Sequence, residues 1–366
     1  MRLIPFLLCV IVLGACVDRS IIPYISTGDE TVQTTRIFVA TNRVQNELGQ
    51  FLGRRGDHVS YLDVEVSIPT QRSTGSVRTN QNRTDPSRHF AVTQQAEIEN
   101  GAEFIRSLNA ALVQQPSGER EVMIYVHGYN NSFSDGIFRM AQIMHDFEVP
   151  ATAVHYSWPS AMNPFGYVHD LDSVLAARDE LEKVLFEVSQ SGADRVILTG
   201  HSMGTLLVME TLRQIELTQP GWSNDHLSGV VLISPDISVD LFRAQADRIQ
   251  DLPQPFAIFV SQRDRALQLS ARLTGVRERL GAIRDAEPVA ELPVTVVDVS
   301  AFTDGPLGHF TVGTSPALIA LLSRGSLVSE AFRDDRSGRS GLLPGTVITM
   351  QNATQLILSP GLLQPQ

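Results

Sequence analysis

The chain has 366 residues, of which 43% are hydrophobic and 19% are charged, a balance typical of a globular protein rather than a disordered one. This length allows one large domain or two small ones. The formal net charge of −11 provides no positive field for a phosphate backbone, so nucleic acid is excluded as an expected partner.

The first residues have the layout of a secretory signal. Arg2 precedes an apolar run over residues 3–13, which is too short to cross a bilayer as a helix. The run ends in Leu13-Gly14-Ala15-Cys16, which resembles the bacterial lipobox, where the cysteine becomes the lipidated first residue of the mature protein. We therefore expect a signal peptide over residues 1–15, a lipid on Cys16 and a polar tether over residues 16–34. A plain export signal with an incidental cysteine is the alternative.

Lipidation of Cys16 would account for the cysteine usage of the chain. The other cysteine, Cys9, lies inside the expected signal peptide, so the mature protein would keep no free thiol, disulfide or cysteine metal site. Lipid chains on one cysteine can hold a soluble domain at a membrane without a spanning helix. We expect a membrane-anchored lipoprotein of the cell envelope on the periplasmic face. Val17 stands where an aspartate commonly marks inner-membrane retention, which weakly favours the outer membrane.

Short apolar runs and helical stretches alternate along the rest of the chain. The expected strands are 36–40, 59–68, 122–126, 152–156, 196–199, 230–233, 256–260 and 294–299. The expected helices are 102–112, 134–147, 172–189, 203–212, 241–249, 267–280 and 316–322, and residues 70–87 read as a polar loop. This alternation predicts an α/β domain over residues 35–325, with a mostly parallel sheet of roughly eight strands and helices on both faces. The two early strands would add an antiparallel edge, and residues 326–366 would be a peripheral tail.

The sequence Gly200-His201-Ser202-Met203-Gly204 matches the Gly-x-Ser-x-Gly pattern of a nucleophile elbow. It follows an expected strand and opens an expected helix, which is the setting that the motif requires. The serine would sit on a strained turn, with glycines removing the side chains that would clash and the helix N-terminus facing developing negative charge. The pattern predicts Ser202 as a nucleophile; a glycine-rich turn around a buried serine is the alternative.

A serine hydroxyl needs a base to attack a carbonyl, and the base needs an orienting acid. In this setting they follow in the chain order Ser, acid, His. His309 lies just after the last expected strand and is the expected base. His226 lies in a polar turn before the strand at residue 230 and is a poor candidate.

The acid has two candidates. Asp264 follows the strand next to last and is the first choice; Asp236, in Ser234-Pro235-Asp236, follows the preceding strand and is the second. Either aspartate would also serve as a helix cap, which is a purely structural role. Asp298, within the last strand, and Asp304, in the loop that carries the expected base, are less favoured.

An oxyanion formed at the serine would need two hydrogen-bond donors. We expect one to be the backbone N–H of Met203 and the other to be the backbone N–H of Tyr129, in the loop after the strand 122–126. For the side chain of His127, at the start of this loop, we expect a structural role in holding the loop.

An irregular aromatic stretch follows the strand 152–156. It begins with Trp158-Pro159-Ser160 and continues over residues 163–167. Loops at the carboxyl ends of parallel strands line the ligand crevice, so we expect a short cap over an apolar pocket. The alternative is that Trp158 and Phe165 fill core space. The spacing of the elements leaves no room for a large inserted lid domain.

Five segments together resemble a bacterial group of α/β-hydrolases, described as esterase- or lipase-like and grouped as domain of unknown function 900. The match runs from about Arg36 to His309, and the segments are 38–43, 126–130, 156–160, 200–204 and 234–236. The resemblance implies the α/β-hydrolase fold and a nucleophile at Ser202, and it implies no substrate. Because Ser234-Pro235-Asp236 is part of the pattern, Asp236 stays a candidate for the acid.

The leading hypothesis is a membrane-tethered serine hydrolase acting on small-molecule or lipid carboxylic esters, with Ser202, His309 and Asp264 as its catalytic residues. No metal or cofactor is required. A serine at the elbow argues against dehalogenases, which use a carboxylate nucleophile. Peptidase, thioesterase and acyltransferase activities use the same residues and stay open. The alternatives from other classes are a non-catalytic lipoprotein that binds a partner and a structural protein of the cell envelope. The oligomeric state is left open.

Overall fold

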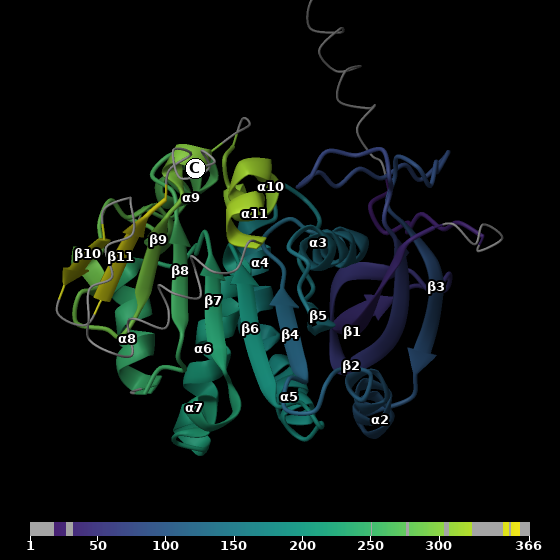
Figure 1. Ribbon diagram of the computed structural model, residues 1–366, viewed down its shortest axis with the longest axis horizontal. Helices are drawn as coiled ribbons and strands as arrows, with labels where there is room; N and C mark the ends of the chain where they lie inside the picture. Colours follow the sequence, from purple (N-terminus) through teal and green to yellow (C-terminus); the bar gives the residue numbers. More distant parts are fainter. Residues whose placement is uncertain are drawn as a thin grey trace, which may run out of the picture.

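A sheet of eleven strands runs through the computed structural model, which describes residues 18–26, 32–249, 251–275, 278–303, 307–323, 347–350 and 353–358 (Figure 1). The strands are β1 (Thr34–Gln45), β2 (Phe51–Ser67), β3 (Ala91–Ile98), β4 (Glu121–Val126), β5 (Thr152–Ser157), β6 (Arg195–His201), β7 (Gly229–Ile233), β8 (Phe256–Val260), β9 (Thr295–Asp298), β10 (Val347–Met350) and β11 (Ala353–Ile357). They lie in the order β10-β11-β9-β8-β7-β6-β4-β5-β1-β2-β3. Every neighbouring pair from β11 to β1 is parallel, and antiparallel pairs close both edges.

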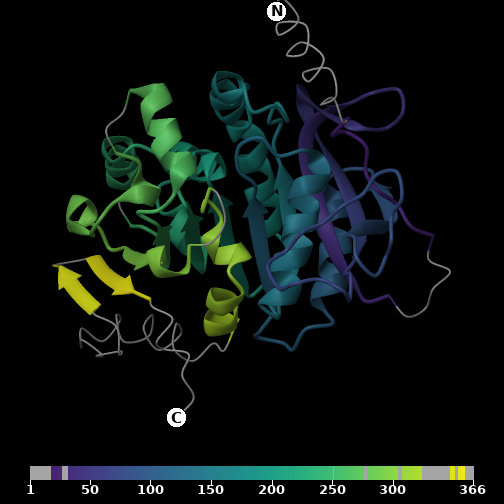
Figure 2. The ribbon, with the colours of Figure 1, turned by 90° about the horizontal axis from the view of Figure 1, so that it is seen from above.

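Helices cover both faces of this sheet (Figure 2). They are α2 (Gly101–Leu112), α3 (Phe133–Asp146), α4 (Tyr167–Ala176), α5 (Arg178–Ser189), α6 (Met203–Thr218), α7 (Trp222–His226), α8 (Val239–Ile249), α9 (Arg265–Thr274), α10 (Thr311–Thr314) and α11 (Pro316–Ser323), with 3₁₀ turns at Leu280–Ala282, Glu287–Val289 and Ser300–Phe302. On one face α6 lies between α5 and α8, with α2 beside α5. On the other face α3 packs against β1, β2 and β5.

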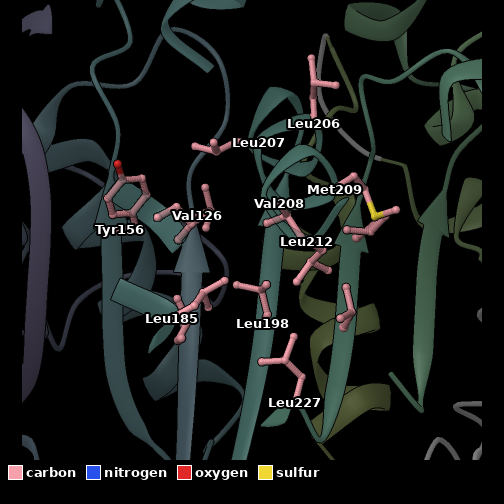
Figure 3. Packing of buried hydrophobic residues seen from close by; sticks show 14 of the residues in the cluster. Val126, Tyr156, Leu185, Leu198, Leu206, Leu207, Val208, Met209, Leu212 and Leu227 are labelled. Atoms are coloured by element: carbon pink, nitrogen blue, oxygen red, sulfur yellow. The ribbon is translucent and has the colours of Figure 1, made fainter. Parts of the chain in front are cut away.

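The two faces of the sheet bury separate sets of apolar side chains because successive residues of a strand point to opposite sides. In β1, Phe38 and Ala40 pack on the α6 face, whereas Ile37 and Val39 pack on the α3 face. The α6 face holds the larger core, in which Leu207, Val208 and Leu212 of α6 lie over the central strands (Figure 3). Strands buried on both faces explain the continuous apolar runs in the sequence.

Every expected strand is present, and the structure adds three more. Strand β3 falls in a polar sequence that the apolar pattern did not indicate, because its outward side chains are exposed at the edge of the sheet. Strands β10 and β11 lie in the expected peripheral tail, where β11 extends the sheet by pairing with β9. At this edge β1 runs parallel to β5, and the antiparallel pairs are β1–β2 and β2–β3, so only β2 runs opposite to the central strands there.

Several helices end earlier or break where a single helix was expected. The stretch 172–189 is two helices, α4 and α5, that meet at Ala177. The expected helix 267–280 ends at Thr274, because Gly275 adopts a left-handed conformation (φ 69°) that terminates α9. Residues 70–87 are irregular, as expected.

Part of the expected tether packs against the domain. Over residues 18–26, Tyr24 forms a parallel bridge to Val92, and the backbone N–H of Val92 donates to the Pro23 carbonyl over 2.9 Å. The Arg19 side chain contacts the loop that follows β4. The expected signal peptide over residues 1–15 and Cys16 lie outside the described residues. Within the described part of the chain, no helix has the length and apolar character needed to cross a bilayer.

Candidate active site

Ser202 occupies the turn between β6 and α6, in the middle of the parallel sheet. Its backbone lies at φ 53° and ψ −126°, a conformation that L-residues rarely adopt and that costs strain. The backbone N–H of Ser202 donates to the Ile233 carbonyl at the end of β7 over 2.9 Å, which fixes the turn to the neighbouring strand. The strained serine therefore stands at the carboxyl edge of the sheet, as the elbow motif predicts.

The glycines on either side of the serine are required by close backbone contacts. A Cβ on Gly204 would lie 2.3 Å from the carbonyl oxygen of His127, and one on Gly200 would lie 3.0 Å from Cα of Thr205. The first distance is far below a normal contact, so α6 can start this close to the end of β4 only with glycine at position 204. These contacts give a steric reason for both fixed glycines of the motif.

The predicted base and acid meet the serine in a single hydrogen-bonded line. Nε2 of His309 lies 2.7 Å from Oγ of Ser202, and Nδ1 of His309 lies 2.7 Å from Oδ2 of Asp264. Asp264 is fully buried, and its Oδ1 accepts the backbone N–H of Leu267 over 3.0 Å as the N-cap of α9. The cap therefore fixes one carboxylate oxygen and directs the other at the imidazole. Asp264 thus caps α9 and contacts the His309 imidazole at the same time.

Asp236, the second candidate for the acid, is also buried next to the site but has other partners. Its Oδ1 accepts from Oγ of Ser270 over 2.6 Å and lies 3.2 Å from Nε of Arg279, and its Oδ2 accepts from the Tyr167 hydroxyl over 3.0 Å. Only its backbone contacts Ser202, through an N–H that donates to the Ser202 carbonyl over 3.3 Å. Asp236 thus joins α4, α9 and the segment around residue 279.

The remaining candidates lie elsewhere. His226 is in α7, where its ring stacks on Trp222. Asp298 accepts from the backbone N–H of Ser300 and caps the turn after β9. Asp304 lies outside the described residues.

The loop after β4 comes within contact distance of Ser202. A Cβ on Gly128 would lie 2.7 Å from Cβ of Ser202, so only glycine allows this approach. Tyr129 follows directly. Neither the backbone N–H of Tyr129 nor that of Met203, the first residue of α6, donates to another residue in the described part of the chain. Within the described residues both N–H groups are therefore left to donate to a group bound at Ser202, as a developing oxyanion would require.

The His127 side chain is buried and structural, as expected from the sequence. Its ring stacks on Trp158 with the centroids 5.0 Å apart, and the indole N–H of Trp158 donates to the His127 carbonyl over 2.7 Å. Burial and the neighbouring Arg43 hold the pKa of His127 well below its usual value, so the imidazole is neutral. The ring pair joins the loops after β4 and β5.

Arg43 is a residue of this site that the sequence analysis did not single out. Its buried guanidinium donates to Oγ of Ser157, to the Ser160 carbonyl and to the Asn131 carbonyl over 3.0, 3.2 and 2.9 Å. No ion pair joins it to a carboxylate within the described residues. Burial lowers the pKa of Arg43 to about 9, which still leaves it charged at neutral pH. A buried cation thus ties β1 to the loops after β4 and β5. The sequence offered one indication of its importance, because Arg43 belongs to the segment 38–43 that resembles the hydrolase group.

The cap expected after β5 is a short loop, and its two large aromatic side chains, Trp158 and Phe165, have different surroundings. Trp158 is fully buried, so it fills core space as the alternative held. Phe165 is 94% exposed and fills none. The Tyr129 hydroxyl holds the loop by donating to the Pro164 carbonyl over 2.6 Å. Buried Asp170, which accepts the hydroxyl of Ser160 over 2.6 Å, fixes its start.

His201, which precedes Ser202, packs beside His309. Its ring lies 5.0 Å from that of His309 and 4.4 Å from that of Phe310, centroid to centroid. Burial, His309 and Arg139 together hold the pKa of His201 well below its usual value, so a neutral ring supports the loop that carries the base. Within the described residues, no cluster of three or more His, Cys, Asp or Glu side chains is placed to hold a metal ion.

Several known proteins are similar to this chain. A profile of the family described as "Alpha/beta hydrolase of unknown function (DUF900)" matches residues 102–325, more than half of the chain. No curated protein matches it.

Among solved structures, the chain is similar to a Pyrobaculum calidifontis esterase, with 12% identity over 82% of this chain and 86% of that one and a TM-score of 0.36. It is also similar to EstE1, a carboxylesterase cloned from a metagenomic library, with 11% identity over 84% and 90% and a TM-score of 0.32. DphMB1 shares 16% identity over 59% and 79%, with a TM-score of 0.36. The family of this chain is assigned from the profile match and not from these structural similarities. The chain belongs to the α/β-hydrolase family of unknown function and has the fold of that family.

Proposed function

We propose that this α/β-hydrolase is a serine hydrolase that cleaves carboxylic esters, with Ser202 as nucleophile, His309 as general base and acid, and Asp264 as the orienting carboxylate. The observation that carries the proposal is the hydrogen-bonded line from the Ser202 hydroxyl through the His309 imidazole to the Asp264 carboxylate, with 2.7 Å at each junction. It occurs at a strained turn beside two unused backbone donors.

The proposed reaction proceeds in two halves. Nε2 of His309 takes the proton of the Ser202 hydroxyl as Oγ attacks the ester carbonyl, and the backbone N–H groups of Tyr129 and Met203 donate to the resulting oxyanion. The tetrahedral intermediate collapses, the alcohol leaves with the proton from His309, and an acyl-enzyme remains. His309 then takes a proton from water, the hydroxide attacks the acyl group, and the acid leaves as Oγ regains its proton.

The position of Asp264 supports the choice of base. Because Oδ2 of Asp264 accepts from Nδ1, the imidazole must carry its proton there, which leaves Nε2 free to accept the serine proton. The buried carboxylate would also stabilise the imidazolium that forms during attack.

The first test is hydrolysis of p-nitrophenyl esters of increasing acyl length, together with labelling by a fluorophosphonate probe. We expect turnover and labelling in the natural protein and loss of both in Ser202→Ala. Ser234→Ala is the matched control, since Ser234 is another buried serine with positive φ (47°), at the end of the neighbouring strand. The acyl length with the highest kcat/KM would define the depth of the acyl site.

A folded protein that neither hydrolyses any ester nor reacts with the probe would contradict the proposal. That result would favour the alternative of a non-catalytic binding protein on this fold. Hydrolysis of thioesters or amides in preference to oxygen esters would keep the mechanism and change the substrate class.

A further inference from the structure

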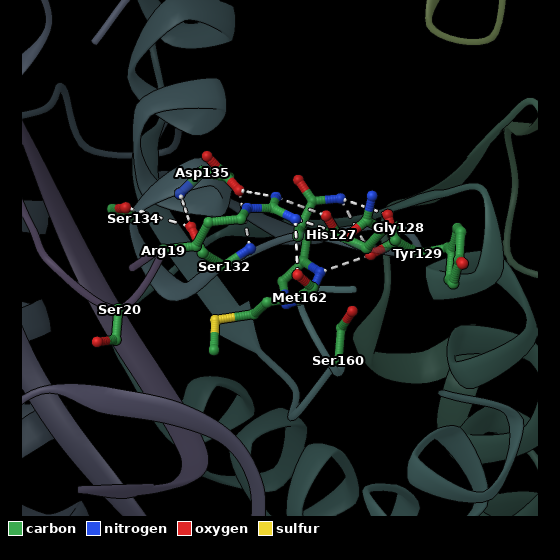
Figure 4. Close-up of polar contacts among 12 residues, drawn as sticks. Arg19, Ser20, His127, Gly128, Tyr129, Ser132, Ser134, Asp135, Ser160 and Met162 are labelled. Carbon is green, nitrogen blue, oxygen red and sulfur yellow. Dashed lines mark hydrogen bonds and ion pairs between the residues drawn. The ribbon is translucent and has the colours of Figure 1, made fainter. Parts of the chain in front are cut away.

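The Arg19 side chain clamps the N-terminal segment to the loops that border the candidate active site (Figure 4). Its guanidinium donates to the Asn130 side chain and carbonyl over 2.6 and 2.8 Å, and to the Met162 carbonyl over 2.9 Å. It also pairs with Asp135 at 2.6 Å. Asn130 follows the proposed oxyanion donor Tyr129, and Met162 lies in the loop after β5. The segment is therefore held at the carboxyl edge of the sheet.

Two further contacts fix the backbone next to Arg19. The Gln81 side chain donates to the Asp18 carbonyl over 2.9 Å, and the Ser20 hydroxyl lies 3.3 Å from Oε1 of Gln50. Cys16 is two residues before Asp18, so its backbone is at most about 7 Å from this fixed point whatever its conformation. A lipid on Cys16 would thus leave the protein at the edge that carries Ser202.

Six of the twelve large apolar side chains that are exposed in the described residues belong to elements at the same edge. They come from the β1–β2 turn, the loop after β5 with the start of α4, helix α9 and the loop before His309, and they are Leu48, Phe165, Val168, Leu269, Leu273 and Leu307. Leu269 and Leu273 lie one turn apart on α9 and share a face. Single exposed apolar residues are ordinary, but a set that rims one edge around a candidate site marks an interaction surface.

The carboxyl edge of the sheet thus borders the candidate active site and lies next to the expected lipid on Cys16. We propose that this rim, defined by the six residues above, docks on a lipid bilayer, and that the enzyme acts on ester lipids resident in the membrane that anchors it. The substrate class rests on the proposed function, whereas the docking does not. Lipid chains on Cys16 would attach the protein at one point only, and the apolar rim would add a second contact with the same bilayer.

The docking test uses a fluorescent probe and needs no enzymatic activity. Both cysteines lie at or before Cys16, so a single cysteine introduced by Phe165→Cys gives one labelling site in the lipidated protein. The matched control is Val113→Cys: Val113 is 57% exposed but follows α2 at the opposite edge, where Gln115 contacts the starts of β4 and β5. The full lipoprotein is reconstituted on vesicles of phosphatidylethanolamine and phosphatidylglycerol.

We expect lipids that carry a spin label to quench a dye at position 165 and to leave a dye at position 113 unchanged. Equal quenching at both positions, or quenching at 113 alone, would overturn the docking. Absence of vesicle binding would overturn it as well, whether or not Cys16 proves to be lipidated.

The substrate class is tested by comparing a vesicle-embedded diacylglycerol with soluble p-nitrophenyl acetate. Phe165→Asp combined with Leu273→Asp should lower the rate on the embedded ester about tenfold or more, because charges replace two exposed apolar side chains that would insert into the bilayer. The rate on the soluble ester should stay the same. Val113→Asp combined with Leu217→Asp, at the opposite edge, should change neither rate.

Equal loss on both esters in the rim variant, or no loss on the embedded one, would overturn the lipid substrate. An enzyme inactive on every ester would instead refute the proposed function and leave the quenching result to decide the docking.

Discussion

Replacement of Asp264 by asparagine tests the orientation of the base, and the structure predicts the direction of the effect. Oδ1 of Asp264 accepts the Leu267 N–H and Oδ2 accepts from Nδ1 of His309. In Asp264→Asn the amide oxygen should stay with the Leu267 N–H, because the reverse orientation would leave two donors facing each other. The amide NH₂ then points at Nδ1 of His309 and becomes the donor.

This reversal moves the imidazole proton to the wrong nitrogen. With Nδ1 accepting, Nε2 carries the proton and cannot take one from Ser202. The size of the loss for such a change in a serine hydrolase is roughly 10⁴ in kcat, or about 5 kcal/mol of transition-state stabilisation. The cap of α9 survives, so we expect the free energy of unfolding to change by less than about 1 kcal/mol.

The control is Asp236→Asn, a second buried carboxylate, which follows the strand next to β6. It leaves Arg279 without its partner at 3.2 Å, so we expect a loss of about 3 kcal/mol in stability. The folded fraction should keep kcat within about tenfold. Rates on p-nitrophenyl butyrate, normalised by fluorophosphonate titration, and urea unfolding give both quantities. The reverse pattern, with Asp236→Asn inactive and Asp264→Asn active, would refute our assignment of the acid.

Three other changes give sharp expectations. Gly128→Ala places a methyl group 2.7 Å from Cβ of Ser202. Because this displaces one of the proposed oxyanion donors, kcat should fall about 10²-fold. An unchanged kcat would show that this loop is not part of the site. Arg43→Met removes the buried donors to β5 and to the loops after β4 and β5, so it should cost about 2–4 kcal/mol in urea unfolding and lower kcat, with Arg43→Lys intermediate. A stable, fully active Arg43→Met would contradict its positioning role. Burial lowers the pKa of His155 to about 3 in the folded protein. As the pH falls from about 6.5 toward 3, the unfolded chain therefore binds a proton that the folded protein does not, and the free energy of unfolding declines by about 1.4 kcal/mol per pH unit. In His155→Asn, whose amide can still donate to the Tyr125 carbonyl, that slope should be shallower by one proton, and an identical slope would exclude His155 as its source.

Local sequence alone indicated the central part of the fold and the elbow. Strands β4 to β9 are buried on both faces, so their continuous apolar runs are visible without any knowledge of their neighbours. The turn at Ser202 is equally local, because the contacts at Gly200 and Gly204 demand glycine at fixed positions around a strand-to-helix turn. Strand β3 was not predicted from the sequence, because it lies at the edge of the sheet, where its outward side chains are exposed and polar.

Only the tertiary structure decided between residues far apart in the chain. Asp264 and Asp236 both follow strands and both are buried, and they differ only in what packs against them: His309 faces the first, whereas Arg279, Ser270 and Tyr167 surround the second. The roles of Arg43 and Arg19 were hidden for the same reason, since their partners are mainly backbone carbonyls of loops more than eighty residues away. A carbonyl acceptor leaves no mark in the sequence, because every residue carries one.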